Sequence, residues 1–266
     1  GRVNAVDTAE STRVLAGRVR YDRRSDYAWA DQTPHLELTE SNGTITRIRG
    51  DSLEFDRAND RVYAHGGVEV RRDSLRATGD NASFYRSENR AILAGSPKAW
   101  DNEGSASGDT LEIRFVQHKV SSIQARPNAK VAYEARADSV AGRSERTTAS
   151  GDTITLFLEN EAARQAVIVG HASSFYWPAE VDSAKGGRNA SRGDTIVVNF
   201  DKGKPRHATV QGNGEGTYYM AAEGDTTGAE KRERILYSGN QIDYDLKGNT
   251  VDVRGNAAIA YREMHL

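Results

Sequence analysis

The stretch Gly50-Asp51-Ser52-Leu53-Glu54-Phe55 is the first of six related hexapeptides in this chain of 266 residues. The other five begin at Gly79, Gly108, Gly151, Gly193 and Gly239. In all six, the third and fifth residues after the glycine are apolar, and the residue between them is polar in every copy except one. Alternation with a period of two is typical of a strand with one buried and one exposed face. The repeat therefore predicts an all-β protein in which each copy starts a strand at a Gly-Asp or Gly-Asn turn.

A second motif follows each hexapeptide after a polar turn. Its clearest copies span residues 62–70, 91–100 and 251–259, and each has a glycine near its middle. Glycine inside a strand pattern indicates a bend or a bulge. We therefore expect each unit to consist of a strand, a polar turn, a second strand, a glycine kink and a third strand that lies in a second sheet.

The spacing of the repeat defines the predicted domain organisation. The first three copies lie 29 residues apart, whereas the later ones lie 42 to 46 residues apart. The extra length falls in residues 134–150, 178–192 and 221–238, which are charged and rich in Gly, Ser and Thr, and which we interpret as loops or solvated hairpins. Residues 1–49 are consistent with a partial unit. No change in composition divides the chain, so the sequence predicts one elongated domain over residues 1–266, with six units in 50–266.

The two motifs together resemble the OstA-type repeat of the lipopolysaccharide-transport proteins LptA, LptC and the periplasmic part of LptD. The similarity runs from Gly50 to about Tyr261. This resemblance implies a twisted, open β-jellyroll in which two antiparallel sheets form a V. It also implies an apolar groove that holds lipid acyl chains, and molecules that stack end to end to bridge the periplasm.

The alternation also predicts which side chains face the interior. They are aliphatic and aromatic, without a charge among them, and we expect them to line the groove: Leu53, Phe55, Val68, Val70, Ala82, Phe84, Leu111, Ile113, Phe115, Ile154, Leu156, Leu158, Ile196, Val198, Phe200, Ile242 and Tyr244. Burying a dozen methylene groups there would contribute on the order of 10 kcal/mol, at about 0.8 kcal/mol per group. The same side chains could instead interlock as the dry core of a β-sandwich.

Composition and missing motifs exclude several classes of protein. The chain has no cysteine, and its formal net charge of −2 argues against a nucleic-acid binder with a basic surface. No apolar run approaches the roughly 18 residues of a membrane-spanning helix. The six histidines lack metal-binding spacing, and neither a nucleophile elbow nor a phosphate loop occurs. We therefore predict no catalytic residue, no metal site and no cofactor.

These observations predict a non-enzymatic, exported protein of the periplasm, with association to the outer membrane as a further option. It would bind lipopolysaccharide or a related glycolipid in its groove and pass it along a protein bridge. Its expected partners are LptC-like or LptD-like jellyroll proteins or further copies of itself, which would pair with sheet edges in Val14–Leu38 and Ile242–Tyr261. Two alternatives remain open: a repeat β-protein that polymerises into filaments or a surface layer without lipid, and a carbohydrate-active β-helical enzyme.

Overall fold

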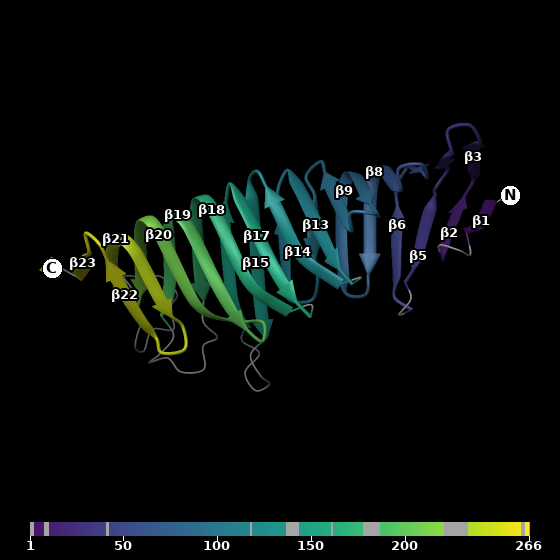
Figure 1. The fold of residues 1–266 in the computed structure, drawn as a ribbon. Coiled ribbons are helices and arrows are strands. Elements are labelled where there is room, and N and C mark those ends of the chain that lie inside the picture. Colours follow the sequence, from purple (N-terminus) through teal and green to yellow (C-terminus); the bar gives the residue numbers. More distant parts are fainter. Residues whose placement is uncertain are drawn as a thin grey trace, which may run out of the picture. The chain divides into compact units, whose positions relative to one another are not determined.

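The computed structural model describes residues 3–7, 11–40, 43–117, 119–136, 144–160, 162–177, 187–220, 234–261 and 264–265. These residues form β-strands joined by turns, and no α-helix occurs among them (Figure 1). In this described part of the chain, no helix is long and apolar enough to cross a membrane. Two compact units divide the chain, Gly1–Arg126 and Pro127–Leu266. The predicted all-β fold is confirmed, and the prediction of a single domain stays a prediction.

Unit 1 consists of two antiparallel sheets, here called sheet I and sheet II. Sheet I has the order β3–β4–β7–β8–β9–β10–β13–β14. Sheet II has the order β1–β2–β5–β6–β8–β9–β11–β12, so β8 and β9 run through both sheets. The strands are β1 (Val3–Asp7), β2 (Thr12–Ala16), β3 (Arg18–Asp22), β4 (Tyr27–Asp31), β5 (His35–Thr39), β6 (Ile45–Arg49), β7 (Ser52–Asp56), β8 (Arg61–Arg72), β9 (Leu75–Tyr85), β10 (Arg90–Ala94), β11 (Lys98–Trp100), β12 (Gly104–Ser107), β13 (Thr110–Val116) and β14 (Lys119–Arg126).

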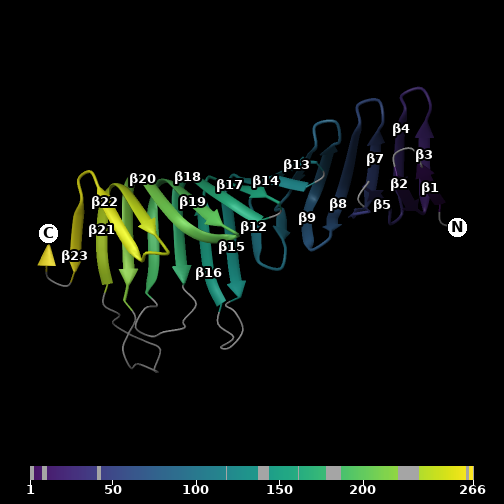
Figure 2. The same ribbon diagram turned by 60° about the horizontal axis from the view of Figure 1, so that its bottom comes forward.

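Unit 2 has the same construction, with its own sheets I and II. Its sheet I has the order β17–β18–β19–β20–β21–β22, and its sheet II the order β15–β16–β18–β19–β20–β21–β23–β24. The long strands β18 to β21 belong to both sheets (Figure 2). The strands are β15 (Ala129–Arg136), β16 (Ser144–Gly151), β17 (Thr153–Glu159), β18 (Ala162–Trp177), β19 (Arg188–Asp201), β20 (Lys204–Tyr219), β21 (Arg234–Asp245), β22 (Thr250–Arg254), β23 (Ala258–Tyr261) and β24 (Met264–His265).

The chain passes between the sheets at corners in which two successive residues have positive φ. Gly66 and Gly67 form such a corner in β8, with φ of 72° and 52°. The Asp51 N–H donates to the carbonyl oxygens of His65 at 2.8 Å and Gly66 at 2.9 Å, and a Cβ on Gly66 would overlap the Asp51 carboxylate. The same arrangement, a glycine packed against an Asp or Asn side chain, recurs as Gly95 with Asp80, Gly170 with Asp152, Gly212 with Asp194 and Gly255 with Asn240. The predicted glycine kink between two sheets is therefore present.

The glycine of the hexapeptide has a different role from the one expected. Its predicted place before the start of a strand is correct for β7, β13 and β17, but β9, β19 and β21 run straight through their Gly-Asp or Gly-Asn pairs. These glycines do not supply unusual dihedral angles; they allow close approach between strands. A Cβ on Gly50 would lie 2.9 Å from the carbonyl oxygen of His65, and one on Gly79 would lie 3.0 Å from that of Ala94. The positive φ belongs instead to the glycine of the second motif.

In the first corner of the chain, the glycine and the residue with a side chain have changed places. Gln32 and Thr33 have φ of 60° and 61°, so side chains occupy the corner where later units have glycine. Facing them is Gly17, whose N–H donates to the carbonyl oxygens of Asp31 and Gln32 at 3.2 and 3.1 Å. In each of these six corners one side lacks a side chain, because the space between the two backbones accommodates only one.

Parts of the three segments interpreted as loops or solvated hairpins are strands, and these strands pair in antiparallel hairpins of sheet II. Residues 144–150 lie in β16, 188–192 in β19 and 234–238 in β21, and all pair with neighbours in sheet II. Residues 137–143, 178–186 and 221–233 lie outside the described residues. The Ser and Thr content suggested loops, but ladder hydrogen bonds use only the backbone, and these residue types can take part in them.

Replacing Gly66 by Ala tests the corner. We expect Gly66→Ala to lower the free energy of unfolding by about 1 kcal/mol more than Gly67→Ala. Both substitutions incur the cost of about 1–2 kcal/mol for a side chain at positive φ, but only the first also meets the Asp51 carboxylate. The double variant Asp51→Gly/Gly66→Ala should recover part of the lost free energy of unfolding. It places a glycine opposite a corner residue that has a side chain, as Gly17 lies opposite Gln32. Urea unfolding measures each variant, and equal losses for the two single variants would contradict this account.

Candidate functional site

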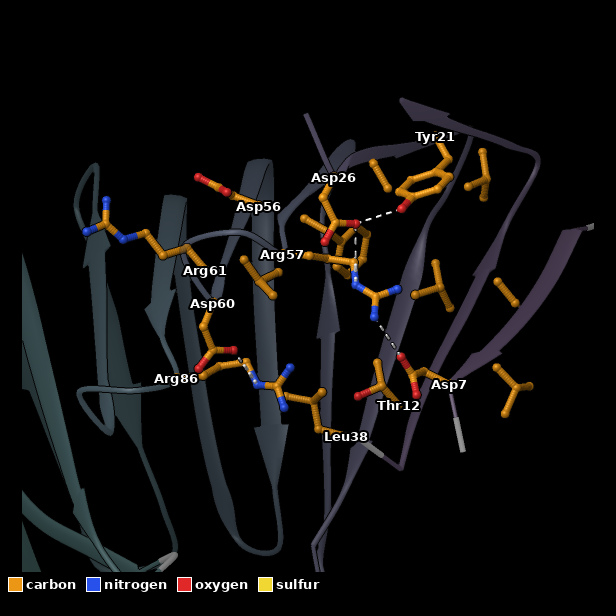
Figure 3. Close-up of a pocket in the computed structure, with 17 residues that line it drawn as sticks. Asp7, Thr12, Tyr21, Asp26, Leu38, Asp56, Arg57, Asp60, Arg61 and Arg86 are labelled. Atoms are coloured by element: carbon orange, nitrogen blue, oxygen red, sulfur yellow. Dashed lines mark hydrogen bonds and ion pairs between the residues drawn. The ribbon is translucent and has the colours of Figure 1, made fainter. Parts of the chain in front are cut away.

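Unit 1 contains a cavity of about 540 Å³ between its two sheets (Figure 3). Strands β3, β4, β7 and β8 of sheet I and strands β1, β2 and β5 of sheet II contribute its walls. The inner lining is apolar and comprises Ala5, Val14, Val19, Ala28, Leu38, Phe55 and Val62. Its size is within the usual range of small-molecule pockets, roughly 300–1,000 Å³. The arrangement suits an apolar ligand, because the lining side chains gain contacts when water is replaced.

Charged side chains surround this apolar lining. Arg57, in the turn after β7 of sheet I, lies 3.4 Å from the Asp7 carboxylate at the end of β1 in sheet II. Its Nε also lies 3.8 Å from Asp26, which accepts a hydrogen bond from the Tyr21 hydroxyl at 2.7 Å (Figure 3). That hydrogen bond is the main cause that raises the Tyr21 pKa. Arg57 therefore connects the two sheets, although an exposed ion pair of this kind contributes only about 0–1 kcal/mol.

The other charged groups at the cavity form local pairs. Arg86 lies 3.6 Å from the Asp60 carboxylate, and the Arg61 guanidinium lies over the Tyr85 ring at 5.2 Å from its centroid. Together the lining holds the three arginines Arg57, Arg61 and Arg86 and the four aspartates Asp7, Asp26, Asp56 and Asp60. Because carboxylates balance the guanidinium groups, the cavity shows no excess positive charge that would favour an anion.

The predicted groove residues fall into two groups according to burial. Nine are buried, mostly those nearest the corners: Leu53, Val68, Ala82, Leu111, Ile113, Ile154, Ile196, Ile242 and Tyr244. Eight are half-buried, mostly farther from the corners: Phe55, Val70, Phe84, Phe115, Leu156, Leu158, Val198 and Phe200. The interior is thus tightly packed beside the corners and more open toward the hairpin turns. Of the seventeen, only Phe55 lines the cavity of unit 1, so the role of the set stays a prediction.

Sequence reasoning missed most of the cavity. Several lining residues come from the N-terminal segment, where the repeat is weak: Val14, Val19, Ala28 and Leu38. The apolar residues at 14, 36 and 38 do indicate strands with an inward face in this segment. The contact between Arg57 and Asp7 joins residues 50 positions apart and has no signal in the sequence. It exists because the two sheets bring the end of β1 and the turn after β7 together.

Two further side-chain contacts connect the sheets away from the corners. In unit 1, the largely buried Arg72 of sheet II pairs with Glu40 (Nη2 to Oε2, 3.0 Å) and lies over the Phe115 ring of sheet I at 5.7 Å. In unit 2, the Tyr133 hydroxyl of β15 donates to the carbonyl oxygen of Gly203 at 2.9 Å, and its ring meets Phe200 edge to face. Each unit therefore has its own side-chain connection across its interior.

The interior of unit 2 also contains buried hydroxyl groups, which the apolar prediction did not include. The Ser191 hydroxyl of β19 donates to the Tyr244 hydroxyl at 2.7 Å, and the Tyr237 hydroxyl donates to Asn189 Oδ1 at 3.0 Å. Ser191, Tyr237 and Tyr244 are 6%, 7% and 4% exposed. We call Asn189, Ser191, Tyr237 and Tyr244 the tyrosine layer. Tyr244 was predicted as apolar lining, whereas its hydroxyl joins sheet I to sheet II.

Burial in this region changes the acidity of the tyrosines. It is the largest cause that raises the pKa of Tyr237 and of Tyr244 above the ordinary value. Burial, followed by the nearby Glu145 carboxylate, likewise raises the pKa of Tyr176. Each phenol therefore stays neutral in the folded chain at a pH at which an exposed tyrosine ionises.

The two-sheet fold and the cavity between its sheets define a β-protein that encloses apolar space. The family model described as LptA/(LptD N-terminal domain) LPS transport protein matches residues 47–204. Because this match covers more than half of the chain, the chain belongs to the LptA/LptD N-terminal family of lipopolysaccharide-transport proteins, and the resemblance seen in the repeats is confirmed.

Among the solved structures that match this chain is the crystal structure of LptH, described as the LptA homologous periplasmic component of the conserved lipopolysaccharide transport device from Pseudomonas aeruginosa. The two chains are 15% identical, the match covers 61% of this chain and 92% of that chain, and the TM-score is 0.40. A comparison with curated proteins found no match.

The raised pKa values predict how stability depends on pH. Above about pH 10 tyrosines ionise in the unfolded chain, whereas the buried phenols stay protonated in the folded chain. The unfolded state then binds fewer protons, so the free energy of unfolding is unaffected by these groups below about pH 10 and falls as the pH rises beyond it. Urea unfolding at about pH 8 and about pH 11 should show a smaller loss in the Tyr237→Phe/Tyr244→Phe variant than in the parent chain. Equal losses would show that these phenols ionise freely in the fold.

Proposed function

We propose that this chain is a non-enzymatic lipid carrier of lipopolysaccharide transport that holds acyl chains between its two sheets. Membership of a transport family supports the general role. The proposal that acyl chains bind between the sheets rests on the cavity of unit 1, because both sheets contribute apolar residues to its inner lining. An acyl chain needs only apolar contact to bind there, since transfer of each methylene from water contributes about 0.8 kcal/mol.

The half-buried residues extend this proposal along each unit. Phe84 and Phe115 in unit 1, and Leu156 and Leu158 in unit 2, face the interior and keep part of their surface accessible. Side chains of this kind can contact a flexible chain without a change in the packed residues beside the corners. The polar head of the lipid would then lie toward the hairpin turns, where charged side chains are frequent.

The proposed bridge would use the open edges of the sheets. Within the described residues, the pairings of β1 and β3 are with β2 and β4 respectively, so each has one edge for a further strand. A strand of another chain could pair there through backbone hydrogen bonds. The proposed partners are related jellyroll proteins or further copies of this chain, in the periplasm and toward the outer membrane.

Replacing Phe55 by Arg tests the lipid-binding proposal. Phe55→Arg places a guanidinium in the apolar lining, and we expect lipid that copurifies with the protein to fall by about tenfold or more, because about 1.4 kcal/mol already produces that change. The matched control is Val116→Arg, since Val116 is 61% exposed and lies outside the cavity lining. Mass spectrometry of extracted lipid measures both variants alongside circular dichroism. Unchanged lipid content in a folded Phe55→Arg protein would refute the proposal.

A further inference from the structure

The inner face of sheet II differs in chemistry between the two units. In unit 1, one row of directly opposed residues is entirely apolar and contains Val14, Leu36, Ile48, Val70 and Ala77. In unit 2, the corresponding row carries hydroxyl groups at Ser174, Ser191 and Tyr237, with Gly216 between the last two. The next row is mixed in unit 1, where it holds Thr12, Leu38, Thr46, Arg72 and Leu75, whereas in unit 2 it holds the polar residues Thr147, Tyr176, Asn189 and Tyr218. Sheet II of unit 2 therefore presents hydrogen-bonding groups to the interior.

Two glycines provide the space for tyrosine rings on this face. Gly216 lies directly opposite Tyr237 on the neighbouring strand, and a Cβ on Gly216 would overlap the Tyr237 ring. A Cβ on Gly187 would likewise overlap the Tyr218 ring. The Tyr237 ring thus lies across β20, and its hydroxyl reaches Asn189 on β19. An aromatic ring that covers a glycine of the adjacent strand fills the space beside it.

Sheet I of unit 2 contacts these residues of sheet II across the interior. Tyr244 of sheet I reaches Ser191 of sheet II at 2.7 Å, and the rings of Tyr237 and Tyr244 lie 6.2 Å apart, edge to face. The two walls are therefore in contact at β19 to β21. An acyl chain that entered here would separate hydroxyl groups from their partners and offer them none in return, which is unfavourable for buried polar groups.

We propose that the tyrosine layer is the limit of lipid penetration in unit 2. This inference rests on the proposed function. Acyl chains contact the half-buried Leu156 and Leu158 of β17 and stop at Asn189, Ser191, Tyr237 and Tyr244, so the inner face of β23 beyond the layer holds no lipid. The layer thereby determines how much of an acyl chain unit 2 can accept.

A photo-crosslinking amino acid at one of three positions tests this inference with radiolabelled lipopolysaccharide as the probe. The positions are Phe55 in the cavity of unit 1, Leu156 before the layer, and Ile259 on β23, which lies directly opposite Tyr237 and is 39% exposed. We expect crosslinks at Phe55 and Leu156, and a yield about tenfold lower at Ile259. This comparison needs no change within the layer itself.

Opening the layer provides the second measurement. In a Tyr237→Ala/Tyr244→Ala background the yield at Ile259 should approach that at Leu156. The matched control is Tyr219→Ala, which removes a tyrosine that stacks on Phe175 on the opposite face of the same sheet, and it should leave the low yield at Ile259 unchanged. If the double variant does not fold, Tyr237→Phe/Tyr244→Phe replaces it; this variant keeps the rings, removes their hydrogen bonds and should give an intermediate yield.

The outcomes separate the two proposals. Equal yields at Leu156 and Ile259 in the parent chain would overturn the inference and leave the proposed function intact. Crosslinks at Phe55 alone would also overturn it, since unit 2 would then hold no lipid for the layer to stop. The absence of crosslinks at both Phe55 and Leu156 would refute the proposed function and this inference with it.

Discussion

The close packing of a positive-φ glycine against an Asp or Asn side chain is the constraint on which this fold depends. At Gly66 and Asp51 the approach leaves no room for a Cβ, and the Asp51 N–H bonds the carbonyl oxygens of the corner. Each such contact turns a strand from sheet I into sheet II. Because the contact recurs at Asp80, Asp152, Asp194 and Asn240, each unit forms two sheets instead of one continuous flat sheet. The exchanged pair Gly17 and Gln32 shows that the requirement is space for one side chain, on either strand.

The corners also explain where space for a ligand is found. Two sheets joined at their corners are closest there, so Leu53 and Leu111 are fully buried, whereas Phe55 and Phe115 remain half-buried. In unit 1 both sheets contribute apolar residues to the inner lining, and a cavity remains between them. In unit 2 the tyrosine layer fills the corresponding interior and connects the walls by hydrogen bonds. The same glycine corner is therefore compatible with either an open or a filled interior, and the side chains that face inward determine which of the two forms.

Much of the fold could be predicted from the hexapeptides. Their period of two predicted that Leu53, Ile154 and Ile196 face the interior, and all three are buried. The composition of residues 144–150 was misleading, because Ser and Thr are as compatible with a strand as with a turn, and only pairing with β18 distinguishes the two. The sequence also could not assign the cavity. Its lining combines residues 5 to 38 with Phe55 and Val62, and these come together only through the order of strands in two sheets.

By itself, the sequence determined the strand content, the repeated glycine corners and the apolar face, because these depend on local backbone geometry and on periodicity within a few residues. Only the tertiary structure decided which corner residue needs to be glycine, which strands continue through Gly-Asp, and which inward side chains surround a space. These outcomes depend on contacts between strands that are distant in sequence. Tyr244 illustrates the difference: its position predicts an inward side chain, but its bond to Ser191, 53 residues away, makes it part of a closed wall.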